Sequence, residues 1–119
     1  MDACRPVTRT VDGRAVQEGA GVRVNRLIGG PALAALDPFL LLDEIRSEAE
    51  DDFAAGFPPH PHRGIETLTY MIEGGFRHED HLGNRAAIAD GGAQWMSTGR
   101  GIIHSEMPRQ EAGLMRGFQ

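Results

Sequence analysis

The 119-residue chain contains no lysine and a single cysteine. Its twelve basic residues are all arginines, scattered singly, and the formal net charge is −5. A nucleic-acid-binding surface needs clustered positive charge, so this composition argues against nucleic acid as a direct partner. Because Cys4 has no second cysteine to pair with, an internal disulfide is excluded, and we expect Cys4 to be an ordinary thiol.

A long hydrophobic run is also missing. The longest, 39–42, falls far short of the ~20 residues that cross a bilayer, and the first thirty residues hold no apolar core of signal-peptide length. We therefore expect no membrane partner and a cytoplasmic location. The length fits one domain, 1–119, and is too short for two ordinary ones.

Glycine and proline are plentiful, which favours an all-β protein with many turns. There are sixteen Gly and seven Pro, while aromatic residues make up only 6%, so the core is expected to consist of Leu, Ile, Val, Met and Ala. Short candidate strands separated by turns are typical of a sandwich or barrel. The acidic stretch 48–52 is expected to be a solvated loop or one helical turn. The candidate strands are 22–25, 36–44 (as a buried strand), 65–72, 76–78, 86–89, 94–97 and 102–107.

Two triplets carry the chemistry: His60-Pro61-His62 and His104-Ser105-Glu106. Side chains two residues apart on a strand share a face, so each triplet offers two metal ligands on one side. The four groups converge if the two strands lie side by side or opposite each other. Pro61 suits an edge or bulged position because it has no N–H to donate to a neighbour.

Three imidazoles and one carboxylate suit a first-row divalent metal. An octahedral Fe, Mn, Ni or Co centre would keep open positions for water, substrate or O₂, whereas a four-coordinate Zn site would be closed and structural. The spacing does not distinguish these metals. The competing interpretation is that such histidines are ordinary surface residues.

Numbering parity predicts which neighbours face the site. Leu68, Tyr70 and Ile72 share the parity of His60 and His62, so they are expected to line the barrel interior beside the ligands.

Three further polar residues lie near the triplets in sequence. Glu66 could be a fifth ligand, but it is expected instead to orient an imidazole or to have a structural role, such as an ion pair with Arg63 or Arg100. His78 and His81 belong to a polar stretch that reads as an exposed hairpin, outside the metal site.

The chain resembles the pirin family of the cupin superfamily in three segments that cover about two thirds of it: 36–44 (LDPFLLLDE), 60–70 (HPHRGIETLTY) and 94–108 (QWMSTGRGIIHSEMP). The general cupin pattern is met only loosely, because the first Gly lies nearer His60 than that pattern prescribes. The resemblance implies a double-stranded β-helix, or jelly-roll barrel, which is the first half of a bicupin. It also places the metal ligands at His60, His62, His104 and Glu106.

Pirins normally carry a second cupin domain, which we expect to be absent from this chain. The chain would then be a fragment or a naturally shortened relative. An open barrel would expose a strand edge and apolar surface, so a homodimer through that edge is expected.

The resemblance further implies a quercetinase-like dioxygenase that opens a flavonol, a small aromatic substrate, with O₂. Its cofactor would be one divalent transition metal, Fe first, with Ni, Mn, Co, Cu or Zn as alternatives. Glu106 would be the catalytic residue that takes the flavonol 3-hydroxyl proton. The missing second barrel weakens this hypothesis. The alternatives are a non-catalytic metal- or redox-responsive protein that modulates a transcription-related protein partner, and a structural cupin without metal.

Overall fold

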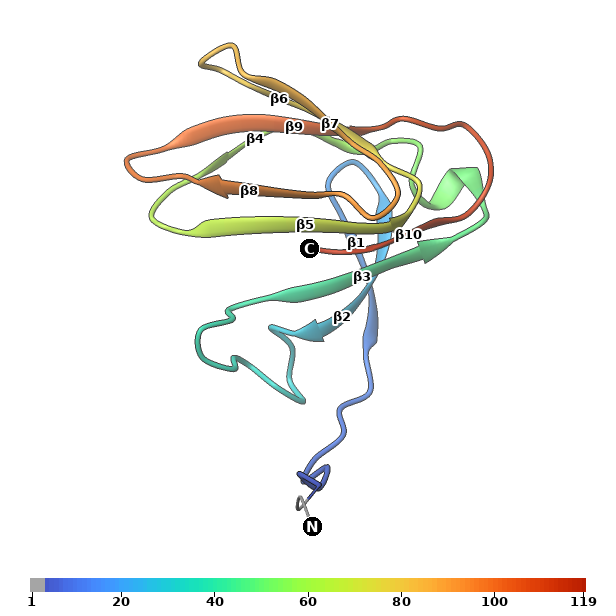
Figure 1. Ribbon diagram of the computed structural model, residues 1–119, viewed down its shortest axis with the longest axis vertical. Coiled ribbons are helices and arrows are strands. Elements are labelled where there is room, and N and C mark those ends of the chain that lie inside the picture. Colours follow the sequence, from blue (N-terminus) through green and yellow to red (C-terminus); the bar gives the residue numbers. More distant parts are fainter. Residues whose placement is uncertain (1–3) are drawn as a thin grey trace.

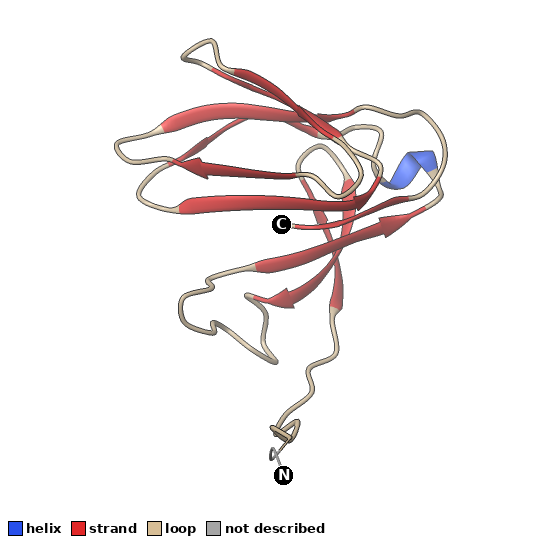
Figure 2. Cartoon of the chain, in the orientation of Figure 1, coloured by secondary structure: helices blue, strands red, loops and turns tan. Residues whose placement is uncertain are grey.

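The computed structural model describes residues 4–119; residues 1–3 of the expected 1–119 domain lie outside this description. The described residues form ten strands and one short 3-10 helix (Figures 1 and 2). The strands are β1 (Arg14–Glu18), β2 (Val22–Ile28), β3 (Leu42–Ser47), β4 (Phe57–His62), β5 (Glu66–Glu73), β6 (Phe76–Asp80), β7 (Arg85–Ile88), β8 (Ala93–Ser97), β9 (Ile102–Pro108) and β10 (Met115–Phe118). No helix among the described residues is long and apolar enough to cross a membrane.

The strands build two antiparallel sheets, which confirms the all-β expectation. One has the order β1-β2-β3-β10-β5-β8 and the other the order β4-β9-β6-β7. Strands distant in sequence lie side by side, because β10 is inserted between β3 and β5, and β9 between β4 and β6. In Figure 1 the sheet of β4, β9 and β6 lies over β5 and β8, so the chain passes repeatedly from one sheet to the other, as in a jelly roll.

The core between the sheets is only partly the expected one. It contains Val22, Val24, Ile45, Phe53, Phe57, Met71, Phe76, Ile88 and Met115. Val, Ile and Met supply most of it, as expected, but phenylalanines contribute too: the rings of Phe57 and Phe76 pack with centroids 6.1 Å apart. A few large rings fill the space between sheets efficiently, because each buries much apolar area.

The parity prediction for β5 was also wrong. Thr69 and Met71 point inward, with 3% and 0% exposure, whereas Leu68, Tyr70 and Ile72 are 46%, 43% and 37% exposed. The reason is that β4 and β5 belong to different sheets. The connection between them therefore resets which parity faces the interior, as a one-residue change of register does.

The segment 36–44 is not one buried strand. Leu36 and Phe39 bond to each other's backbone in an isolated bridge, and β3 begins only at Leu42. Phe39, Leu40 and Leu41 are 52%, 67% and 43% exposed. Because the loop satisfies its own backbone groups, it does not extend the sheet, and its apolar side chains stay at the surface.

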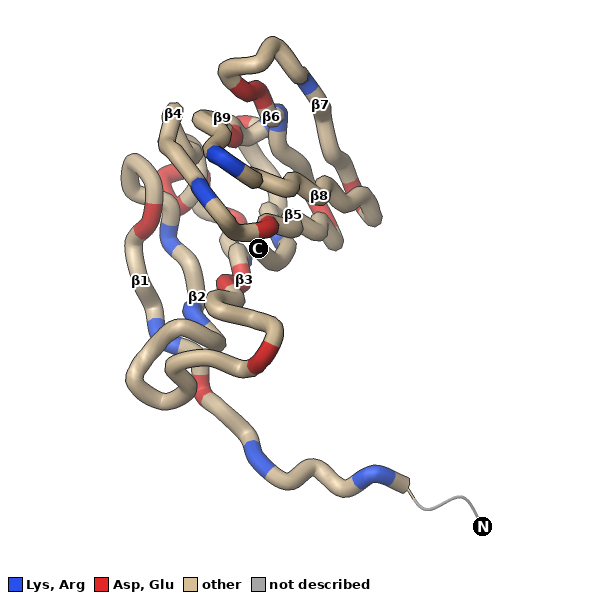
Figure 3. The backbone as a smooth tube through the Cα atoms, turned by 90° about the vertical axis from the view of Figure 1, so that its left-hand side faces the viewer, with Lys and Arg blue, Asp and Glu red and all other residues tan. Residues whose placement is uncertain are grey.

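The remaining expectations agree with the structure in outline. Segments expected at 65–72, 76–78, 86–89, 94–97 and 102–107 form β5 to β9 with shifted ends. The acidic stretch contains the 3-10 helix Glu50–Asp52, a single turn without buried residues. Strand β10 was not expected, although it lies inside the larger sheet. Basic and acidic positions are interspersed along the described chain (Figure 3), in keeping with the scattered arginines of the sequence.

One buried ion pair ties the first three strands together. Asp43 is 5% exposed and accepts two hydrogen bonds from Arg26, each 2.9 Å long, from Nε and Nη2. Arg26 also pairs with Glu18 of β1. The bond to Asp43 raises the pKa of Arg26 above its already high value, although burial opposes this. The guanidinium therefore compensates a carboxylate that is removed from water.

We expect Arg26→Met to lower the free energy of unfolding by about 3 kcal/mol, because it leaves Asp43 buried without a partner. The control is Arg85→Met, whose exposed pair with Glu79 spans 3.7 Å and should contribute less than about 0.5 kcal/mol. Urea denaturation measures both. Equal losses in the two variants would contradict the prediction.

Candidate metal centre

The pairing of β4 with β9 brings the two triplets together. His60 lies opposite His104 and Pro61 opposite Ile103, in antiparallel register. Of the two arrangements left open by the sequence, the structure has the one in which the two strands lie side by side. Strand β4 is an edge of its sheet, and sheet edges are where residues without an N–H are tolerated, so Pro61 lies at an edge as expected.

The structure gathers three of the four predicted ligands into one cluster. One ring nitrogen from each of His60, His62 and His104 lies within 4.8 Å of the others, close enough to hold one metal ion. The Nε2 atoms of His60 and His104 are 2.9 Å apart. His104 is buried, while His60 and His62 are half-buried, so the cluster is open on the β4 side.

The outer nitrogen of His60 is held by the backbone. Its Nδ1 lies 2.8 Å from the carbonyl oxygen of Pro58. A carbonyl only accepts, so Nδ1 of His60 carries the hydrogen and, in the neutral ring, Nε2 carries the lone pair. That lone pair points into the cluster, as ligation requires.

Glu106 is buried beside the cluster but is held from the opposite sheet. Its Oε1 accepts from Thr69 Oγ1 at 3.0 Å, and its Oε2 accepts from Gln119 Nε2 at 2.7 Å. Its carboxylate groups with His104 and His78 within 4.8 Å, not with all three clustered histidines. The four-ligand set of His60, His62, His104 and Glu106 therefore stays a prediction.

Burial favours the neutral form of two clustered imidazoles, His62 and His104. Desolvation, followed by the nearby His60 and His78, lowers the pKa of His104 to about 3. Desolvation and then His60 lower the pKa of His62, against the attraction of Glu106. Neutral imidazoles are the form that binds metal. Convergent neutral nitrogens beside a buried carboxylate thus fit a first-row divalent ion, although they do not identify which one.

The expectation that His78 lies in an exposed hairpin was wrong. His78 is 4% exposed, and its Nδ1 lies 3.1 Å from Nδ1 of His104. The hairpin of β6 and β7 does form, but β6 pairs with β9, which places His78 opposite Glu106. Phe76 shares the parity of His78 and is buried, and this alternation was the available sequence signal. His81 is exposed as expected, with Nδ1 accepting from the backbone of Ile103.

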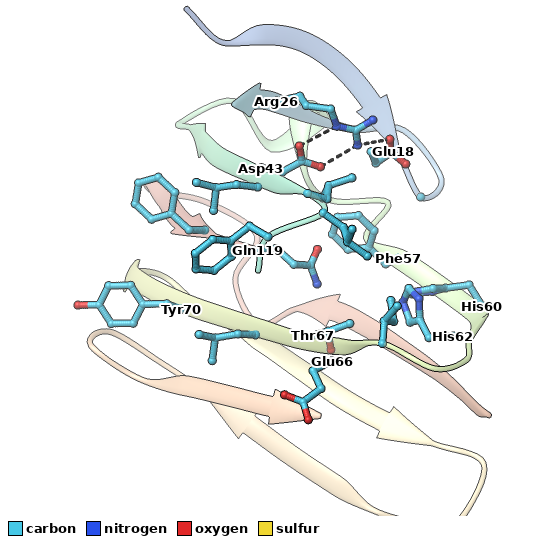
Figure 4. A pocket seen from close by; sticks show the side chains of 18 of the residues that line it. Glu18, Arg26, Asp43, Phe57, His60, His62, Glu66, Thr67, Tyr70 and Gln119 are labelled. Carbon is cyan, nitrogen blue, oxygen red and sulfur yellow. Dashed lines mark hydrogen bonds and ion pairs between the residues drawn. The ribbon is translucent and has the colours of Figure 1, made fainter. Parts of the chain in front are cut away.

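Of the roles expected for Glu66, the structural one agrees with its contacts, but through partners other than the expected arginines. Its carboxylate accepts from Trp95 Nε1 at 3.1 Å and from Ser97 Oγ at 3.2 Å, both on β8. It forms no ion pair with Arg63 or Arg100 among the described residues. Figure 4 shows Glu66 directed away from His60 and His62, since it lies on the outer face of β5.

A cavity of about 1160 Å³ opens beside the cluster (Figure 4). His60 and His62 lie at one end of it, and the Arg26–Asp43 pair borders another side. Gln119 projects between them and joins the cavity to Glu106. The apolar part of the wall includes Pro38, Phe39, Leu40, Leu41, Leu68, Tyr70 and Phe118.

Two sheets that enclose a histidine cluster on paired strands define a cupin-type barrel. The family model described as Pirin matches residues 21–119, and the chain therefore belongs to the pirin family. Human Pirin is 48% identical over 112 residues, which are 93% of this chain and 37% of that protein.

Two other similarities involve quercetin 2,3-dioxygenases by name. A Pseudomonas aeruginosa protein that is proposed by its name to have this activity is 56% identical over 119 residues, which are 100% of this chain and 42% of that protein. The crystal structure of quercetin 2,3-dioxygenase from Acinetobacter baumannii has a TM-score of 0.76 and 28% identity, covering 90% of this chain and 36% of that one. The chain thus spans well under half the length of these relatives.

We expect the metal-free protein to lose stability as the pH falls from 7 to 5. An unfolded histidine has a pKa near 6.5, whereas that of folded His104 is about 3. Between these values the unfolded chain binds more protons, so the free energy of unfolding falls with pH. Thermal midpoints of chelator-treated protein at several pH values measure this. His104→Asn should show a shallower fall, and a midpoint that rises on acidification would contradict the prediction.

Proposed function

We propose that the chain is a metal-dependent cupin whose one divalent transition metal, iron first, is bound by His60, His62, His104 and Glu106. The observation that carries the proposal is the convergence of three imidazoles at the end of a cavity with apolar walls. Ni, Mn, Co, Cu or Zn are the alternatives, since the donor set suits each of them.

We assign to this site a dioxygenase activity of the quercetinase type, with a flavonol and O₂ as substrates. The names of the Pseudomonas and Acinetobacter proteins support this assignment. When bound, the metal would supply Lewis acidity that favours the deprotonated hydroxyketone of the substrate. The apolar wall would hold a flat aromatic ring system and exclude water, and the substrate's polar edge would face the histidines.

Glu106 is the residue that we assign to proton transfer. Its two hydrogen bonds, from Thr69 and Gln119, fix the carboxylate in orientation and keep it available as an acceptor. A carboxylate held in this way is suited to take the 3-hydroxyl proton of the substrate. Thr69 lies on β5 and Gln119 directly follows β10, both in the six-stranded sheet, and the two residues bond to each other. Because Glu106 lies on β9 of the other sheet, this arrangement depends on both sheets.

A second candidate function is a non-catalytic, metal- or redox-responsive protein that modulates a transcription-related partner. The exposed apolar face of β5 and β8, with Leu68, Tyr70 and Trp95 at 46%, 43% and 67% exposure, favours a protein contact. The expected cytoplasmic location stays a prediction in either case.

The metal site is tested by elemental analysis of protein purified without added metal. We expect about one transition-metal ion per chain, lost in His62→Ala because an imidazole ligand is removed and kept in the control His81→Ala. The same preparations are then given quercetin in an oxygen electrode. Oxygen uptake with release of carbon monoxide supports the dioxygenase, whereas bound metal without uptake favours the second function. Absence of metal, even after metal is added, would exclude both.

We also propose that two copies associate through the exposed barrel edge and the apolar surface beside it. Monomeric proteins rarely leave contiguous apolar patches of more than a few hundred Å² uncovered. Light scattering coupled to size-exclusion chromatography should give a dimer mass that falls to the monomer mass in Trp95→Glu. A monomer at all concentrations would contradict this.

A further inference from the structure

The two ring nitrogens of His104 face different partners. Nε2 points at His60, with 2.9 Å between the two Nε2 atoms, and Nδ1 points at His78, with 3.1 Å between the two Nδ1 atoms. His104 and His78 are only 2% and 4% exposed. Without a metal, the lone pair on Nε2 of His60 accepts the hydrogen of His104 Nε2, so metal binding has to move that hydrogen to Nδ1 of His104.

Only one hydrogen fits between the two Nδ1 atoms when both rings are neutral. If His78 donates it, the hydrogen of His104 is on Nε2, and that nitrogen has no lone pair for a metal. If His104 donates it, Nε2 of His104 keeps its lone pair, and the hydrogen of His78 is on its own Nε2. Only the second arrangement is compatible with the proposed metal site.

We propose that His78 is a positioning residue that, once metal occupies the cluster, accepts the Nδ1–H of His104 and so holds both its ring orientation and the tautomer that binds metal. The inference rests on the proposed metal site and deepens it. Partners of this kind, which hold the outer nitrogen of a ligand histidine, raise metal affinity without contacting the ion. His60 has the equivalent partner in the carbonyl of Pro58.

The backbone around His78 is suited to this role. Strand β6 is paired on both sides, with His78 opposite Glu106 of β9 and opposite Ala86 of β7. An interior strand with two hydrogen-bonded neighbours holds its side chains more firmly than an edge strand does. The ring of His78 lies against that of His104, with centroids 4.9 Å apart.

The competing role for His78 is that of a metal ligand, because one atom each of His78, His104 and Glu106 also lies within 4.8 Å of the others. The two roles predict different losses. Removing a ligand abolishes stoichiometric binding, whereas removing a positioning residue weakens binding at unchanged stoichiometry.

The test is a titration of metal-free protein with Co²⁺, followed by its visible absorption. His78→Leu and His78→Asn have the same side-chain shape, but only Asn places an oxygen where Nδ1 of His78 stands. We expect His78→Leu to bind one Co²⁺ per chain about 10- to 100-fold more weakly than the wild type. His78→Asn should restore most of the affinity, and His81→Leu should bind as the wild type does.

Unchanged affinity in His78→Leu would overturn the inference, as would loss of all binding at saturating Co²⁺ or equal weakness of the Asn and Leu variants. A wild-type protein that binds no Co²⁺ would overturn the metal site itself, so the two failures are distinguishable. Nitrogen-15 spectra of the wild-type protein loaded with Zn²⁺ need no variant to fold. They should show hydrogens on Nδ1 of His104 and on Nε2 of His78; a hydrogen on Nδ1 of His78 would contradict the proposal.

Discussion

The antiparallel register between β4 and β9 is the constraint on which the site depends. It sets His60 directly opposite His104, so their side chains emerge on the same face at the short distance of a cross-strand pair. A shift of one residue would turn every ligand of one strand to the other face. The edge position of β4 leaves the His60 side of the cluster open, while β9 is paired on both sides and buries His104.

Around this pairing, buried polar atoms have partners that act on the site. The carbonyl of Pro58 contacts the outer nitrogen of His60, and His78 contacts that of His104. Thr69 and Gln119 donate hydrogen bonds to the two carboxylate oxygens of Glu106. Buried donors and acceptors need such partners for stability alone. The same bonds fix ring orientation and carboxylate position before a ligand arrives, so the requirements of the fold and of the proposed chemistry coincide.

The surface beside the site leaves apolar side chains uncovered, whereas those of the core are buried. The loop at 36–41 and the outer face of β5 and β8 leave apolar side chains exposed around the cavity, and the chain spans 42% of its Pseudomonas relative. The proposed substrate site and the proposed dimer contact share this region. Covering the apolar face would therefore also alter access to the histidines.

The sequence by itself determined the strands rich in β-branched residues, the turns and the two ligand triplets. These features can be read from the sequence because the alternation of side chains along a strand and the glycines of turns are local properties. It also placed Pro61 correctly at a sheet edge. Tertiary structure decided which face of each strand is inside. Parity failed for Leu68, Tyr70 and Ile72 because β4 and β5 lie in different sheets. The place of β10 between β3 and β5, and the contact of His78 with His104, likewise follow from long-range pairings, which local alternation does not specify.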